Sequence, residues 1–178
     1  MSNQFIRRVA ALRAAMHQSG LDSVLLNPGP SMPYLSGLHF HISERPVILC
    51  LPANGEASII VPELEAQKLN HASFALEAFT YSEDVSSWQA AFTAGLARLA
   101  SMGARRVGIE PRSLRVLELR FREGALPQIS LVSCEGAMAS LRAKKDSSEL
   151  DLMQEAVRMA QDALKATLPH VKVGVSER

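Results

Sequence analysis

The segment Leu38-His-Phe-His-Ile-Ser-Glu-Arg45 carries the side chains of this sequence that are best suited to chemistry. His39 and His41 are two residues apart, so in an extended conformation both imidazoles point to the same side. A histidine forms hydrogen bonds or gains charge near neutral pH, and the guanidinium of Arg45 presents paired donors that match a carboxylate. Three interpretations remain open: contact with a ligand, a metal site built from His39, His41 and Glu44, and a surface loop without a chemical role.

No self-contained catalytic motif accompanies this segment. The sequence has no glycine-rich phosphate loop, no paired-cysteine metal site and no Gly-x-Ser-x-Gly nucleophile elbow. A dinuclear metal site for hydrolysis requires several carboxylates and a histidine that converge from different elements. The acidic residues here lie mostly beside basic residues on predicted helix faces, where solvation explains them. Apart from the metal site left open for His39, His41 and Glu44, we therefore expect neither a catalytic residue nor a metal ligand in this chain.

Composition and charge indicate an ordinary globular chain. Of its 178 residues, 47% are hydrophobic and 21% are charged, and the formal net charge is +1 at pH 7. Sequence-independent binding of nucleic acid requires a clustered basic face, which is missing, so we expect no nucleic-acid partner. The densest basic set alternates with Glu118 and Glu123 and is interpreted as a solvated helix face; it consists of Arg112, Arg115, Arg120 and Arg122.

Apolar segments and cysteines bear on location. No run approaches the roughly 18 apolar residues that a membrane span requires, and no signal core follows the first arginines, so we expect no membrane association. Cys50 and Cys134 lie inside strand-like apolar runs. This placement indicates buried free thiols, and a cytoplasmic location is the expectation that follows.

Helical periodicity alternates with short apolar segments along most of the chain. Helices are predicted over 5–20, 62–69, 84–100, 113–122 and 134–141, and strands over 21–26, 46–51, 57–61, 75–79, 105–110 and 129–132. Tyr34-Leu-Ser-Gly37 is interpreted as a short turn. This alternation predicts an α/β fold with a central mixed β-sheet flanked by helices on both faces, in which 46–51 and 57–61 are antiparallel.

A long amphipathic helix is predicted near the carboxyl terminus. Asp146 and Glu149 have the spacing of a capping box, and Pro169 ends the helix. Behind the cap, apolar residues recur every three or four positions, at Leu150, Met153, Val157, Ala160, Leu164 and Leu168. Gly174-Val-Ser-Glu177 then provides a turn and a possible new helix start. Because core periodicity pauses before Asp146 and a new element opens at the end, we expect a domain boundary there and a longer parent chain.

Several motifs occur in a familiar order. They are Asn27 through Tyr34-Leu-Ser-Gly37, Arg45-Pro-Val-Ile-Leu, Gly55, Ile60-Val-Pro-Glu-Leu64, Arg106-Val-Gly-Ile-Glu-Pro111, Leu141-Arg-Ala-Lys-Lys-Asp-Ser-Ser-Glu-Leu150 with Ala156 and Ala160, and Gly174-Val-Ser-Glu177. Together they resemble the pita-bread metallohydrolases, the family of Xaa-Pro aminopeptidases, prolidases and creatinases. Asp146 stands where that family often has Ser or Thr, and it still caps a helix.

The resemblance implies a domain organisation and a parent activity. Residues 1–142 would form a creatinase/prolidase-like amino-terminal domain, and 143–178 would be the linker and first helix of a catalytic domain that is absent. The parent would cleave Xaa-Pro bonds in short peptides with two divalent metals (Mn, Co or Zn), whose ligands would lie beyond Arg178. In such enzymes the amino-terminal domain supports a homodimer, and the loop after the Tyr-Leu-Ser-Gly turn reaches the neighbouring subunit's active site. His39, His41 and Arg45 would then close the substrate pocket in trans, with Arg45 holding a substrate carboxylate.

Other functions remain compatible with the sequence. Within the same family, the parent could hydrolyse a non-peptide C–N bond as creatinases do. Relatives of the same fold that have lost their metal ligands bind other proteins instead. The remaining alternative is a free-standing α/β domain that binds a small molecule.

Overall fold

The computed structural model describes residues 3–176, and the chain divides into two units, one ending at Leu141 and the other beginning at Arg142. Glu177, the last residue of the predicted carboxyl-terminal motif, lies outside the described residues.

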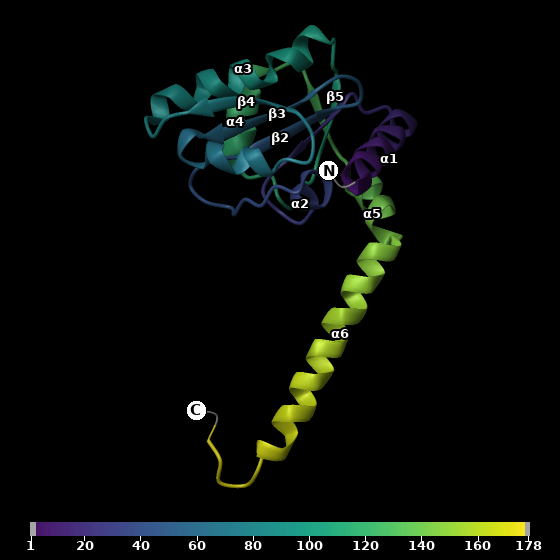
Figure 1. Ribbon diagram of the computed structural model, residues 1–178. Helices are drawn as coiled ribbons and strands as arrows, with labels where there is room; N and C mark the ends of the chain where they lie inside the picture. The colour runs from purple at the N-terminus through teal and green to yellow at the C-terminus, as the bar shows by residue number, and fades with distance from the viewer. Residues whose placement is uncertain (1–2, 177–178) are drawn as a thin grey trace. The chain divides into compact units, whose positions relative to one another are not determined.

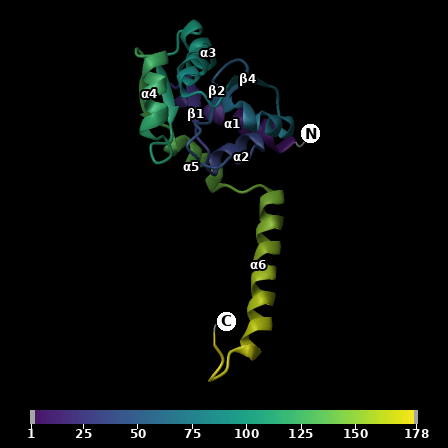
Figure 2. The same cartoon turned by 90° about the vertical axis from the view of Figure 1, so that its left-hand side faces the viewer.

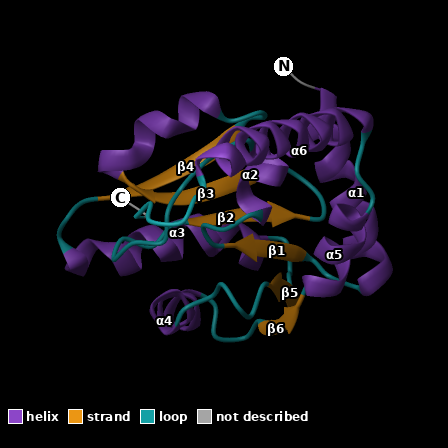
Figure 3. Ribbon diagram, turned by 90° about the horizontal axis from the view of Figure 1, so that it is seen from below, coloured by secondary structure: helices purple, strands orange, loops and turns teal. Residues whose placement is uncertain are grey.

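The first unit is built on a six-stranded sheet of order β4-β3-β2-β1-β5-β6 (Figure 3). Its strands are β1 (Ser23–Leu26), β2 (Ile48–Pro52), β3 (Ala57–Pro62), β4 (Leu76–Tyr81), β5 (Arg106–Ile109) and β6 (Ser130–Ser133). In central β1, Val24 lies opposite Leu51 of antiparallel β2 and Gly108 of parallel β5. β2 and β3 are antiparallel, whereas β3–β4 and β5–β6 are parallel. The predicted mixed sheet is confirmed.

Helices cover both faces of this sheet, as predicted (Figure 1). One face carries α1 (Asn3–Ser19), α2 (Ser31–Ser36) and α5 (Glu135–Ala143), and the other carries α3 (Trp88–Ser101) and α4 (Val116–Ala125). Val24 and Leu26 enter the core under the first set and Leu25 enters the core under the second. Successive side chains of a strand point to opposite sides, so strands whose consecutive residues are apolar give the sheet two apolar faces.

Several local elements differ from the sequence-based prediction. Tyr34-Leu-Ser-Gly37 is the end of helix α2 and not an isolated turn; Gly37 has a φ of 75° and its N–H donates to the Pro33 carbonyl. The helix predicted over 62–69 is the 3-10 helix η1 (Glu63–His71). The helix predicted over 84–100 divides into the 3-10 turn η2 (Val85–Ser87) and α3. These differences are confined to the type and ends of elements, which local backbone hydrogen bonds decide.

The second unit consists of α6 (Ser147–Thr167), which is one continuous helix (Figure 2), and the 3-10 turn η3 (Leu168–His170). Asp146 Oδ1 accepts from the Glu149 N–H at 2.9 Å, and Glu149 Oε2 accepts from the Asp146 N–H at 3.1 Å, which confirms the capping box. The apolar stripe is exposed at Leu150, Met153, Val157, Leu164 and Leu168. Within residues 3–176, no helix has both the length and the hydropathy needed to cross a bilayer.

Candidate functional site

The loop between α2 and β2 presents both histidines of the candidate site to solvent. His39 and His41 are exposed, while Phe40 between them is 7% exposed and packs into the core. The Lys68 ammonium lies 5.1 Å from the centre of the Phe40 ring. The order exposed–buried–exposed along His39, Phe40 and His41 is the alternation that a two-residue period predicts, and it leaves both imidazoles accessible from outside the domain.

Arg45, at the end of this loop, is held by carboxylates of the chain itself. Its Nε lies 2.9 Å from Glu83 Oε1 and its Nη2 lies 2.7 Å from Glu83 Oε2, and its Nη1 pairs with Glu44. The hydrogen bonds between Arg45 and Glu83 raise the pKa of Arg45 and lower the pKa of Glu83. The Arg45 side chain is 28% exposed, so a ligand reaches it only in competition with Glu83 and Glu44.

The return of the loop into β2 is fixed by two further contacts. The buried Tyr81 hydroxyl donates to the Pro46 carbonyl at 2.7 Å, and burial raises the pKa of Tyr81. The Ser43 hydroxyl accepts from the Arg45 N–H at 3.2 Å and donates to the Arg45 carbonyl at 3.3 Å. Backbone and side-chain contacts together therefore define the conformation from Ser43 to Pro46.

Arg115, just before α4, reaches across to the same loop. Its Nη1 donates to the Ser43 carbonyl, while its Nε lies 2.9 Å from Glu118 Oε1. Glu118 is 1% exposed and Arg122 is 8% exposed, so the prediction of a solvated helix face is wrong for these two residues. Residues three or four apart share a helix face, and this face of α4 lies against the sheet. Arg120 and Glu123 do form an exposed pair, at 2.7 Å.

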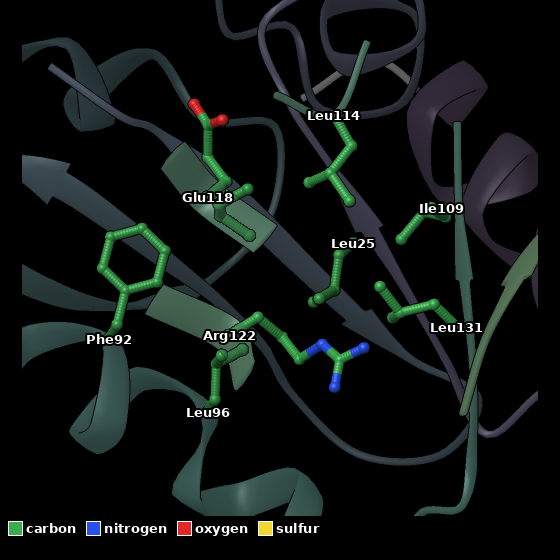
Figure 4. Close-up of a pocket in the computed structure, with 9 residues that line it drawn as sticks. Leu25, Phe92, Leu96, Ile109, Leu114, Glu118, Arg122 and Leu131 are labelled. Atoms are coloured by element: carbon green, nitrogen blue, oxygen red, sulfur yellow. The ribbon is translucent and has the colours of Figure 1, made fainter. Parts of the chain in front are cut away.

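Glu118 and Arg122 border a small enclosed space between α4 and the sheet. Figure 4 shows the Glu118 carboxylate and the Arg122 guanidinium directed toward different ends of a lining that is otherwise apolar, including Leu25, Phe92 and Leu131. The cavity has a volume of about 10 Å³, room for about one water molecule and not for a peptide.

The Arg122 guanidinium makes hydrogen bonds at the end of α4. Its Nη1 donates to the carbonyls of Leu126 and Ile129 at 3.1 and 3.2 Å, while its buried Nε has no partner among the described residues. Burial lowers the pKa of Arg122. Its contacts are structural, because they join the end of α4 to the start of β6.

The described residues do not assemble a metal centre. No group of three or more His, Cys, Asp or Glu side chains is placed to hold a metal ion anywhere in residues 3–176. The structure thus does not bring His39, His41 and Glu44 together as a group of ligands. Glu44 instead pairs with Arg45.

Three residues were not recognised from the sequence: Glu83 and Arg115, which contact the loop, and Glu118, which holds Arg115. Glu83 lies 38 positions from Arg45, and Arg115 lies 72 positions from Ser43, and no periodicity links such distant residues. The three-residue spacing of Arg115 and Glu118 is a usable signal for a pair on a helix. It does not reveal that the pair is buried.

Comparison with known proteins gives a consistent result. Residues 8–144 match the model of a family described as the creatinase/prolidase N-terminal domain. The chain is 27% identical over 169 residues to a probable dipeptidase PepE of Mycobacterium tuberculosis, covering 95% of this chain and 44% of that protein. It is 21% identical over 172 residues to a putative dipeptidase YkvY of Bacillus subtilis, covering 97% of this chain and 47% of that protein. The chain thus spans less than half of the length of these curated relatives.

Solved structures share the fold. A prolidase from Thermococcus sibiricus superposes with a TM-score of 0.84 at 21% identity, over 100% of this chain and 47% of that chain. The creatinase/prolidase N-terminal domain of an X-Pro dipeptidase from Streptococcus pyogenes gives a TM-score of 0.62 at 17% identity, over 75% of this chain and 98% of that chain. The predicted type of α/β fold is confirmed.

Proposed function

We propose, since the chain belongs to the creatinase/prolidase N-terminal domain family as its motifs predicted, that it serves as the non-catalytic amino-terminal domain of a peptidase that cleaves Xaa-Pro bonds. The observation that carries this proposal is the match of residues 8–144 to that family, joined to curated relatives described as dipeptidases. These relatives are more than twice as long as the matched chain, which leaves room for a catalytic domain in the full-length protein.

The domain's own contribution would be to shape the substrate pocket of a neighbouring subunit with the loop that carries His39, His41 and Arg45. Both histidines are exposed and face outward together, which supports contact with a molecule outside the domain. Arg45 is the group suited to a peptide carboxylate, provided that it exchanges Glu83 for the substrate.

Homodimerisation of the full-length protein is the assembly that this role requires. Ile42 is 58% exposed and Val116 is 68% exposed. Each is adjacent in sequence to one partner of the Arg115–Ser43 hydrogen bond, so the two lie on one region of the surface. Exposed apolar side chains beside a candidate site support contact with another polypeptide.

The buried free thiols Cys50 and Cys134 support a cytoplasmic location.

Two divalent metals, Mn, Co or Zn, would supply the activated water for amide hydrolysis in the full-length enzyme. The described residues of this chain do not fit that centre, since they provide no cluster of ligands. We propose that the ligands belong to the rest of the full-length protein. No step of the reaction is assigned to this chain's residues beyond binding and orienting the peptide.

Turnover by the full-length gene product tests this function. The purified protein, loaded with Mn²⁺, is incubated with an Xaa-Pro dipeptide, an Xaa-Pro tripeptide and creatine. We expect hydrolysis of a peptide that a chelator abolishes and added metal restores, because the water nucleophile depends on the metal. The 178-residue chain alone serves as the control and is expected to hydrolyse none of the three.

The other outcomes identify the alternatives. Preference for the dipeptide indicates a prolidase, and preference for the tripeptide indicates an aminopeptidase. Turnover of creatine alone contradicts the peptidase proposal and indicates a C–N hydrolase. Absence of turnover with Mn, Co and Zn indicates a protein-binding relative that has no metal.

A further inference from the structure

Among the described residues, the side chain of Arg115 links the loop of the candidate site to the start of helix α4. Its guanidinium places Nε and Nη2 on the Glu118 carboxylate and Nη1 on the Ser43 carbonyl. A guanidinium is planar and its donors form a rigid fork. Once Glu118 fixes two donors of the fork, the direction of the third is fixed as well.

Glu118 is suited to hold that fork in place. Its side chain has 0% exposure, against 32% for the Arg115 side chain, so its position is set by packing. Glu118 Oε2 also accepts from the Arg115 backbone N–H at 3.2 Å, which joins the pair to the first turn of α4. A buried carboxylate requires such partners, because an unpaired buried charge is very unfavourable. The Arg115–Glu118 pair therefore holds the remaining donor, Arg115 Nη1, in a fixed position against the Ser43 carbonyl.

The bound carbonyl belongs to the residue that sets the backbone of Arg45. The Ser43 hydroxyl makes hydrogen bonds with both the N–H and the carbonyl of Arg45. A shift of the Ser43 backbone would consequently displace Arg45 and the outward-facing His39 and His41 on the same loop.

We propose that Arg115, oriented by the buried Glu118, is a positioning residue that holds the His39–Arg45 loop in the conformation needed at the substrate site. The loop's conformation is a property of this chain, whereas its effect on catalysis rests on the proposed peptidase function. Two measurements separate these two claims.

The first measurement is amide hydrogen exchange along the 178-residue chain, together with the NMR signals of the His39 and His41 rings. The double variant Arg115→Met/Glu118→Met removes the tether without leaving a buried charge unpaired. We expect exchange at the Arg45 amide to increase on the order of tenfold and the two ring signals to shift, while amides of β1 and β2 keep their protection.

Two further variants make this test decisive. Arg120→Met/Glu123→Met removes a pair with the same three-residue spacing on the same helix that does not touch the loop, and it should leave the loop unchanged. Arg115→Lys keeps a cation beside Glu118, but a single ammonium cannot reproduce the fork; it should raise loop exchange by a smaller factor even if the double variant fails to fold. Unchanged loop exchange in both Arg115 variants, or an increase spread equally over the sheet, would overturn the proposal.

The second measurement uses the full-length gene product. If it is a peptidase, the double variant should raise KM about tenfold while kcat stays within about twofold, since the loop orients the substrate and takes no part in the chemical step. The Arg120→Met/Glu123→Met variant should keep wild-type values. If the product has no peptidase activity, the proposed function fails, and hydrogen exchange alone still decides whether Arg115 positions the loop.

Discussion

Arg45 is the residue on which the proposed role in substrate binding depends, and its ion pairs allow two interpretations. Glu83 and Glu44 already neutralise its guanidinium, and Glu83 takes two of its donors. In the first interpretation, Glu83 occupies two donors of the Arg45 guanidinium until a substrate carboxylate replaces it. In the second interpretation, the Arg45–Glu83 ion pair only anchors the loop and Arg45 does not bind the substrate. The pair is exposed enough for solvent to weaken it, so exchange of partners is physically accessible.

Two substitutions in the full-length enzyme distinguish these interpretations. If Arg45 binds the substrate, Arg45→Ala should raise KM by about ten- to a hundredfold with metal content unchanged, because a charge-assisted hydrogen bond is lost. Glu83→Gln should then lower KM, since a competing carboxylate is gone. Steady-state kinetics and metal analysis provide the measurement. Equal increases of KM in both variants would support anchoring, and unchanged kinetics for Arg45→Ala would remove Arg45 from the site.

At the scale of elements, the packing of α3 on the sheet depends on Gly95. A Cβ built at Gly95 would lie 2.5 Å from Ile60 Cγ1 and 2.9 Å from Ile60 Cδ1. Ile60, on β3, is 0% exposed and cannot move aside into solvent. The absence of a side chain at Gly95 thus sets how closely the helix approaches β3, and this outweighs the weak helix propensity of glycine.

We expect Gly95→Ala to destabilise the first unit by about 1–3 kcal/mol, because overpacking at a buried contact exceeds the gain in helix propensity. Gly136→Ala in α5 is the matched control, since a Cβ there meets nothing within 4 Å. It should be neutral or stabilising by up to about 1 kcal/mol. Urea unfolding followed by circular dichroism measures both. A Gly95→Ala variant as stable as wild type would show that β3 and α3 separate readily.

At the scale of the whole molecule, the two free thiols report on cooperative opening of the first unit. Cys50 and Cys134 are 2% and 1% exposed and lie in the cores on opposite faces of the sheet. Burial raises the pKa of both thiols, and that of Cys134 to about 12. Because a thiol reacts as its thiolate, neither is reactive in the native fold at neutral pH.

We therefore expect both thiols to react with a disulfide reagent at pH 8 at one common rate, on the order of a thousandfold slower than in guanidinium chloride, since reaction requires unfolding. Absorbance of the released thiolate measures the rate, and Cys50→Ala and Cys134→Ala variants assign each phase. Rapid reaction of one thiol alone would contradict cooperative behaviour and locate a local opening at that face of the sheet.

Sequence alone determined the class of fold, the order of its elements and its family, because hydrophobic periodicity and capping act over a few neighbouring residues. The alternation of helices and strands and the Asp146–Glu149 cap both follow from such local rules. The exposure of His39 and His41 on either side of the buried Phe40 matches the two-residue alternation that their spacing suggests.

Only the tertiary structure decided how those residues are held. Arg45 meets Glu83, and Arg115 meets Ser43, through contacts between elements far apart in the chain. Whether the charges on α4 are solvated or buried likewise depends on which face of the helix packs on the sheet: Glu118 is enclosed, while Glu123 pairs at the surface. No local pattern specifies that orientation, because packing on the sheet sets the rotation of the helix about its axis. The same rotation determines which side chain reaches the loop.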